Sequence, residues 1–189
     1  MTFEELGVRE DLLRAIADMG YVAPMPVQEK VIPHLLNEDS DVVALAQTGT
    51  GKTAAFMLPI LDHLIKERRP RHIGHPRALV LSPTRELAVQ TAENVRAYSK
   101  YTELPFACLI GGVSQFGQVK DIKRGAETYI ACPGRLIDLM TQGVVYLDQV
   151  ECFVLDEADR MLDMGFLPDI KRIISKLPKA RQSLFFSAT

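Results

Sequence analysis

The stretch Asp41-Val42-Val43-Ala44-Leu45-Ala46-Gln47-Thr48-Gly49-Thr50-Gly51-Lys52-Thr53 decides how this chain folds. A short apolar run leads directly into a glycine-rich loop, and a helical pattern follows. Strand, loop and helix in this order form a phosphate cradle, because Gly49 and Gly51 let backbone amides point inward and the helix presents its positive end to an anion. Lys52 can reach the β- and γ-phosphates of a nucleoside triphosphate, and the Thr53 hydroxyl can bind magnesium.

A second apolar run, residues 152–155, ends in Asp156-Glu157-Ala158-Asp159. A carboxylate at the tip of a buried strand can hold magnesium through water, and a neighbouring one can orient and deprotonate the attacking water. An ordinary helix start also favours acidic residues. Because a phosphate cradle lies upstream, we favour a role for these acids in binding magnesium and water over an ordinary acidic helix start. We therefore predict Lys52, Asp156 and Glu157 as catalytic residues, and Thr53 and Asp156 as the metal ligands.

Six short apolar runs alternate with segments of helical period, such as Ala88, Ala92, Val95 and Tyr98. Nearly continuous apolar character suits strands buried on both faces, and alternation with helices indicates a parallel sheet. The predicted fold class is α/β, a mostly parallel sheet with helices on both faces. The strands are expected at residues 42–45, 78–81, 106–110, 129–131, 152–155 and 183–186.

The composition bounds the class of protein. With 189 residues, 47% of them hydrophobic, the chain is predicted to form one domain, with N-terminal helices in 1–40 and a core in 41–189. A net charge of -2 leaves no overall basic excess, so any nucleic-acid contact must be a local patch. Three cysteines without disulfide or zinc spacing, an acidic N-terminus and no apolar stretch of membrane length predict a soluble, cytoplasmic protein.

The strongest basic run covers residues 66–72. We favour a solvated loop or helix end here over a nucleic-acid contact, because charge runs are usually solvated. His72 and His75 could suggest a metal, but they lack cysteine or carboxylate partners at ligand spacing. A metal site in this loop is therefore disfavoured.

The two loops together resemble those of the DEAD-box RNA helicases, and further motifs occur in that family's order along essentially the whole chain. The resemblance implies a RecA-like P-loop fold, and the motif spellings favour a bacterial, RhlE-like member. The matching segments are Phe3 with 20–28 (the adenine-reading Q motif), 83–87 (motif Ia), Gly111-Gly112 (the glycine doublet), 132–135 (motif Ib) and 187–189 (motif III).

For the nucleotide site, the resemblance implies that ATP binds with Mg²⁺ and leaves as ADP. The Gln28 amide can pair with both N6 and N7 of adenine, which favours ATP over GTP. Phe3 is expected to stack on the base. Met25 replaces the family's usual Thr or Ser, so a hydroxyl contact is lost. The implied nucleotide-binding residues are Phe3, Gln28, Gln47, Thr48, Gly49, Thr50, Gly51, Lys52 and Thr53.

The resemblance also implies an RNA surface. The residues of this surface would contact the phosphates and sugars of RNA, so binding should be largely independent of the RNA sequence. For Arg85 and Arg135 the alternative is a surface salt bridge. Cys132 replaces the usual Thr, so a phosphate contact or helix cap should be weaker there. The implied RNA contacts are Pro83, Thr84, Arg85, Gly111, Gly112, Pro133, Gly134 and Arg135, and the residues implied to couple RNA to nucleotide are Asp159, Ser187 and Thr189.

The function implied is local separation of RNA duplexes driven by ATP hydrolysis. The family's second RecA-like domain, which supplies arginines to the ATP site, is expected to follow Thr189. Without it, this domain should bind nucleotide weakly and hydrolyse almost nothing. Three alternatives remain: another P-loop ATPase such as a DNA translocase, a nucleotide- or partner-binding module without catalysis, and a small-molecule kinase. Gln28 and the spelling of 156–159 argue against the translocase.

Overall fold

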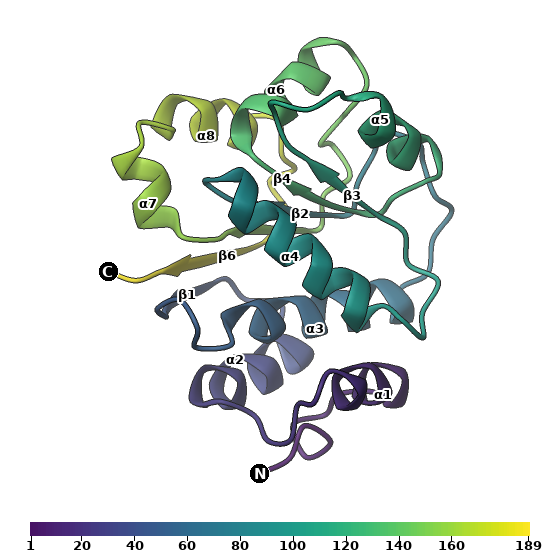
Figure 1. Cartoon of the computed structure of the whole chain (residues 1–189), viewed down its shortest axis with the longest axis vertical. Helices are drawn as coiled ribbons and strands as arrows, with labels where there is room; N and C mark the ends of the chain where they lie inside the picture. Colours follow the sequence, from purple (N-terminus) through teal and green to yellow (C-terminus); the bar gives the residue numbers. More distant parts are fainter.

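Six parallel strands form one sheet in the order β1-β6-β5-β2-β4-β3 in the computed structural model, which describes residues 1–189 (Figure 1). Every neighbouring pair is parallel, so each connection must cross back over the sheet. The predicted α/β class and the parallel sheet are confirmed. The strands are β1 (Val42–Leu45), β2 (Ala78–Leu81), β3 (Phe106–Leu109), β4 (Thr128–Ala131), β5 (Cys152–Leu155) and β6 (Gln182–Ser187).

Eight helices flank the sheet: α3 and α4 lie on one face with α2 and α1 packed against them from outside, and α5 to α8 lie on the other face (Figure 1). None of them combines the length and the apolar character that a membrane span requires. The helices are α1 (Glu10–Asp18), α2 (Pro26–Asn37), α3 (Lys52–Lys66), α4 (Arg85–Tyr98), α5 (Phe116–Lys123), α6 (Pro133–Thr141), α7 (Ala158–Asp163) and α8 (Leu167–Ile174).

A hydrophobic core lies on each face of the sheet, and side chains of the central strands pack into the two cores alternately. Successive side chains of a strand point to opposite faces, so Val154 packs with α1 to α4 while its neighbour Phe153 packs with α5 to α8. Strands β2, β4 and β5 are buried along their whole length, as predicted for strands covered on both faces.

The same prediction is wrong for β1. Val43 is 74% exposed and Leu45 is 72% exposed, while Val42 and Ala44 pack on the side of α1 to α4. Strand β1 lies at the edge of the sheet with β6 as its only neighbour, and no helix covers its other face. An apolar run alone does not distinguish an edge strand from a central one.

The N-terminal segment packs beside α4 and supports the start of α2. Phe3 is 5% exposed, and its ring centroid lies 6.1 Å from that of Tyr21. The Tyr21 hydroxyl lies 3.0 Å from the hydroxyl of Tyr98 on α4. Pro26 occupies the first turn of α2, where its missing N–H costs no hydrogen bond. These contacts hold Tyr21 against α4, a few residues before α2 begins.

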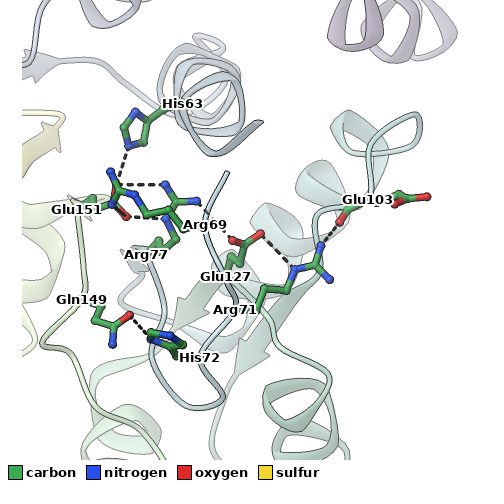
Figure 2. A network of polar contacts seen from close by, with 9 residues as sticks. All are labelled: His63, Arg69, Arg71, His72, Arg77, Glu103, Glu127, Gln149 and Glu151. Atoms are coloured by element: carbon green, nitrogen blue, oxygen red, sulfur yellow. Dashed lines mark hydrogen bonds and ion pairs between the residues drawn. The ribbon is translucent and has the colours of Figure 1, made fainter. Parts of the chain in front are cut away.

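The basic segment between α3 and β2 is an exposed loop, as predicted, but ion pairs hold it to the sheet (Figure 2). Arg69 Nη1 lies 2.8 Å from a carboxylate oxygen of Glu151, and Arg71 Nε lies 3.7 Å from one of Glu127. The buried Arg77 pairs with both acids. Because these acids directly precede β4 and β5, the network lies at the opposite end of the sheet from the glycine-rich loop.

Candidate nucleotide and RNA site

The loops that carry the motifs meet at one edge of the sheet, because the carboxyl ends of parallel strands all lie there. Strands β1, β6 and β5 are neighbours, and the loops that follow them carry the predicted nucleotide-binding and coupling motifs. Strands β2, β4 and β3 form the other half and lead into the predicted RNA-contacting motifs. The strand order thus divides the edge into two adjoining functional halves.

The glycine-rich loop is tied to α2 through one buried amide. Gln28 is 2% exposed, its Nε2 donates to the Gly51 carbonyl oxygen at 3.0 Å, and its Oε1 accepts from the Met25 N–H at 2.9 Å. Gly51 has a left-handed φ of 81°, and a Cβ there would lie 2.4 Å from the Gln28 Nε2. Only glycine fits this position, both for its backbone angle and for the space available.

A cavity of about 620 Å³ opens between the loop, α4 and the end of β5. Its volume suits a small-molecule ligand of nucleotide size. The predicted residues on its wall are Gln28, Thr48, Gly49, Gly51, Lys52, Thr53, Asp156 and Glu157. Gln47 and Thr50 are not on the wall; the hydroxyl of Thr50 donates to the Gln47 carbonyl oxygen at 2.6 Å and closes the loop's turn.

Lys52 lies between the two predicted catalytic acids. Its Nζ is 3.0 Å from Asp156 Oδ1 and 3.4 Å from Glu157 Oε1, and all three side chains are buried. Thr48 also donates to Glu157 Oε1, at 3.1 Å. Burial raises the pKa of Asp156 above its ordinary value, and the Lys52 ammonium opposes part of that rise. The three residues predicted as catalytic therefore lie together, and Thr53, the other predicted metal ligand, lines the same cavity.

Glu157 has an unusual backbone. It is the only residue other than glycine with a positive φ, 53°, and it lies directly before α7. Left-handed geometry at a non-glycine residue costs about 1–3 kcal/mol, and such outliers cluster at functional sites. The buried Oε2 of Glu157 accepts no hydrogen bond within the protein. The exposed Arg160 places its Nη1 3.7 Å from this oxygen. A carboxylate oxygen that accepts no hydrogen bond beside a cavity fits a role toward a cation or a water.

The cavity wall also includes eleven residues that were not among the predicted site residues, and several of them are polar. Tyr21, Thr91 and Asn94 all line it, whereas Phe3 does not and packs against Tyr21 instead. Tyr98 also lines the cavity but is 1% exposed, so the half-buried Tyr21 is the aromatic side chain more accessible to a base. Its place within the segment that resembles the Q motif could have indicated it. The spacing of Thr91 and Asn94 on α4 carried no comparable signal, because polar residues at helical spacing usually face solvent.

Arg85 and Gly112 meet in the other half of the edge. Gly112 has a φ of 75°, and a Cβ there would lie 2.5 Å from the Arg85 Nη1, so the guanidinium occupies space that only glycine leaves free. Arg85 is exposed and forms no ion pair, so the surface salt bridge considered for it is absent. Thr84 caps α4 by accepting from the Leu87 N–H at 3.2 Å. Pro83 is buried beneath it.

Arg135 is engaged within the protein. Its Nη1 donates to Gln118 Oε1 at 3.0 Å and its Nη2 donates to the Val113 carbonyl oxygen at 3.0 Å. A surface salt bridge accounts for little of this, because Asp138 Oδ2 is 3.9 Å from Nε. Of the residues beside it, Pro133 is buried at the start of α6, and Gly134 is exposed.

Cys132 precedes α6 as its N-cap residue. Its side chain makes no capping hydrogen bond, so the weaker cap expected from the thiol is confirmed. Burial raises the pKa of the Cys132 thiol to about 11. The thiol is therefore protonated at neutral pH and adds no charge to this half of the edge.

The predicted coupling residues lie together where β6 ends. The Thr189 hydroxyl donates to Asp159 Oδ2 at 3.1 Å, and the Ala46 N–H donates to the Ser187 carbonyl oxygen at 2.8 Å. Burial would raise the pKa of Asp159, but hydrogen bonds from Arg160, Ser187 and Thr189 lower it below its ordinary value. One short loop therefore contacts both the start of the glycine-rich loop and the acid after β5.

A glycine-rich cradle with a lysine at the start of α3, facing two acids at the end of a central parallel strand, defines a P-loop nucleoside triphosphatase domain of RecA-like fold. The model of the DEAD/DEAH box helicase family matches residues 25–189. The chain belongs to that family.

Relatives and a solved structure agree with this membership. The chain is 43% identical over its whole length to the ATP-dependent RNA helicase DeaD of Escherichia coli, covering 29% of that protein. It is 44% identical over 99% of its length to the ATP-dependent RNA helicase RhlB of Pseudomonas aeruginosa, covering 48% of it. The crystal structure of a DEAD box protein from Methanococcus jannaschii superposes with a TM-score of 0.89 at 37% identity, covering this whole chain and 50% of that one. The chain spans less than half the length of these two curated relatives.

Proposed function

We propose that this chain is the ATP-binding domain of an RNA helicase that couples ATP hydrolysis to local separation of RNA duplexes. The observation that carries the proposal is the shared cavity wall, on which Gln28, Lys52, Asp156 and Glu157 converge beside the loops of the other half of the edge. The names of the relatives, ATP-dependent RNA helicases, support the same activity.

Within the cavity each side chain has a role that its position supports. Thr53 and Asp156 would hold Mg²⁺ together with water molecules, since magnesium keeps most of its own water shell. The metal would neutralise the phosphate charge. When nucleotide binds, the Lys52 ammonium would contact the β- and γ-phosphates in place of Asp156 and Glu157. Glu157, whose Oε2 accepts no hydrogen bond, would orient and deprotonate the attacking water.

Gln28 would select adenine. Its amide already uses one N–H on Gly51 and one lone pair on Met25, and it keeps a second N–H and a second lone pair. These match the N7 acceptor and the N6 donor of adenine, whereas guanine offers two acceptors there. Tyr21 would supply the aromatic wall beside the base. Phe3, originally predicted to stack on the base, would instead support Tyr21 from behind.

RNA would bind across the other half of the edge. Arg85, the amides of Gly111 and Gly112, and the start of α6 would contact phosphate and sugar, largely independently of sequence. Asp159, Ser187 and Thr189 would transmit the state of the nucleotide site. In the complete enzyme a second RecA-like domain would close over both ligands and supply the missing arginines, and the protein would work in the cytoplasm. The RhlE-like assignment stays a prediction.

Calorimetry of ADP binding to the purified chain, with and without Mg²⁺, tests the nucleotide site. Wild-type chain should bind Mg·ADP about tenfold more tightly than Mg·GDP, because about one hydrogen bond is lost with guanine. Thr53→Val should abolish the effect of Mg²⁺ on affinity, while the matched control Thr53→Ser keeps the hydroxyl and the effect. Equal affinity for ADP and GDP, or a magnesium effect that survives Thr53→Val, would contradict the assignment.

The RNA half needs its own measurement. A labelled single-stranded RNA bound to the wild-type chain at low salt should be displaced by unlabelled RNA at lower concentration than by DNA of the same sequence, because 2′-hydroxyls contribute. Displacement by DNA at the same or lower concentration would favour the DNA translocase.

A further inference from the structure

Gln118 is a buried amide on α5 that belongs to none of the motifs described above. It is 7% exposed, and both ends of its side chain are used. Its Nε2 donates to the carbonyl oxygen of Ile110 at 2.9 Å, and its Oε1 accepts from Arg135 Nη1 at 3.0 Å. The other terminal nitrogen of Arg135 donates to the carbonyl oxygen of Val113 at 3.0 Å. One glutamine–arginine pair thus holds the residue on each side of the glycine doublet.

The doublet needs such support, since glycine is the most costly residue to order. Gly111 and Gly112 have no side chains to restrict them, and Gly112 occupies a φ of 75°. Neither residue belongs to a helix or strand that could fix its backbone. With Ile110 and Val113 both held, the two intervening residues have little freedom left. The amides of the doublet are therefore ordered before any ligand arrives.

We propose that Gln118 is a positioning residue for RNA: it links α5 to Arg135 and fixes the glycine doublet in its RNA-binding conformation. This inference rests on the proposed RNA-binding role of the doublet. Binding to an ordered loop avoids the cost of ordering it, so losing the pair weakens affinity without removing any contact to RNA. Arg135 acts here as part of the scaffold that joins two RNA-contacting loops.

The structure supplies a control residue close to Gln118, at the N-cap position of the same helix. Gln115 also makes two side-chain hydrogen bonds, both with Gln142, at 2.8 and 3.1 Å, and neither reaches the residues beside the doublet. Gln118→Leu and Gln115→Leu therefore make the same chemical change three residues apart. Gln118→Glu keeps an acceptor for Arg135 but places a carboxylate oxygen against the Ile110 carbonyl. The Gln118→Glu variant therefore separates the bond to Arg135 from the bond to Ile110.

The experiment measures the affinity of the whole chain for a fluorescent oligouridine by anisotropy and for ADP by calorimetry. Gln118→Leu should weaken RNA binding about tenfold, the equivalent of about one hydrogen bond, and leave ADP affinity within about twofold. Gln118→Glu should fall between Gln118→Leu and wild type. Gln115→Leu should bind both ligands like wild type. In hydrogen exchange, the Gly111 and Gly112 amides should exchange faster in both Gln118 variants.

Several results would overturn the inference. RNA affinity of Gln118→Leu within twofold of wild type would do so, as would an equal loss in Gln115→Leu or a parallel loss of ADP affinity. Where Gln118→Leu fails to fold, Gln118→Glu decides, and wild-type RNA affinity and exchange rates in it reject the idea. A wild-type chain that binds ADP and no RNA would remove this inference together with the RNA half of the proposed function. Normal RNA binding by wild type and by both Gln118 variants would remove this inference alone.

Discussion

The Lys52 ammonium compensates the negative charge of two buried carboxylates in the site. It lies between Asp156 and Glu157, away from water. Removing one member of a buried ionic group leaves the others uncompensated, which costs more than the group itself contributes. A lysine predicted for phosphate binding is therefore also a structural residue while no nucleotide is bound.

Lys52→Ala should lower the free energy of unfolding by about 3–5 kcal/mol at pH 7.5. The pKa of Asp156 is already raised by burial, and without the ammonium it rises further, so protonation is easier in the folded state than in the unfolded one. The loss should therefore shrink as the pH falls from 7.5 to 5. Urea denaturation at both pH values measures it. Lys120→Ala, at an exposed lysine without an ion pair, is the control. An equal loss at both pH values would contradict the argument.

At the residue scale, sequence reasoning works best where chemistry restricts residue type. Lys52, Asp156 and Glu157 were predicted as catalytic residues from their motifs, and the structure places the Lys52 ammonium beside both acids. The partners of Arg135 were not predictable. They depend on how loops from different strands pack, and no spacing in the sequence places Gln118 between Ile110 and Arg135.

At the scale of elements, the six strands were predicted to within a residue or so at each end, because apolar runs between helical segments mark strands strongly. The exposure of β1 was missed. Strand order comes from pairings between distant segments, and only that order makes β1 an edge. The two acids that hold the basic loop before β2, the buried Glu127 and the half-buried Glu151, were not predicted for the same reason (Figure 2).

The ion pairs before β2, β4 and β5 should make stability depend on pH. Burial would raise the pKa of Glu151, but hydrogen bonds from His63 and Arg77 and the charge of Arg69 lower it from 4.5 to about 2. A lowered folded pKa adds stability above the ordinary value and loses it as the pH falls through the folded value. Glu151→Gln should therefore cost about 1.5–3 kcal/mol at pH 7, because charged hydrogen bonds are lost.

The difference between wild type and Glu151→Gln should shrink below about pH 4.5 and vanish near pH 2. Chemical denaturation at pH 7, 5, 4 and 3 follows it. Asp148→Asn, which removes an exposed partner of His75, serves as the control and should change little. A constant difference across this range would show that Glu151 acts through packing alone.

At the scale of the whole molecule, the sheet carries the cradle, the lysine and the acids of the proposed catalytic site, and the proposed second domain would supply its arginines. Arginines supplied by a partner domain contribute about 10³–10⁵ in rate to phosphoryl transfer. The chain alone, spanning less than half of its two curated relatives, should therefore release phosphate from ATP at a negligible rate, with or without RNA. Steady-state phosphate release measures this. Turnover of about 1 s⁻¹ or more would contradict it.

The uncovered side of β1 has a consequence for how molecules of this protein meet. Strand β1 pairs with β6 on one side only, so its outer edge presents unpaired N–H and C=O groups, and the exposed Val43 and Leu45 add apolar surface beside them. No proline or charged side chain within the strand repels an approaching chain. In concentrated solutions the protein should therefore self-associate through this edge strand. A short peptide that pairs with β1 as an added strand should prevent that self-association.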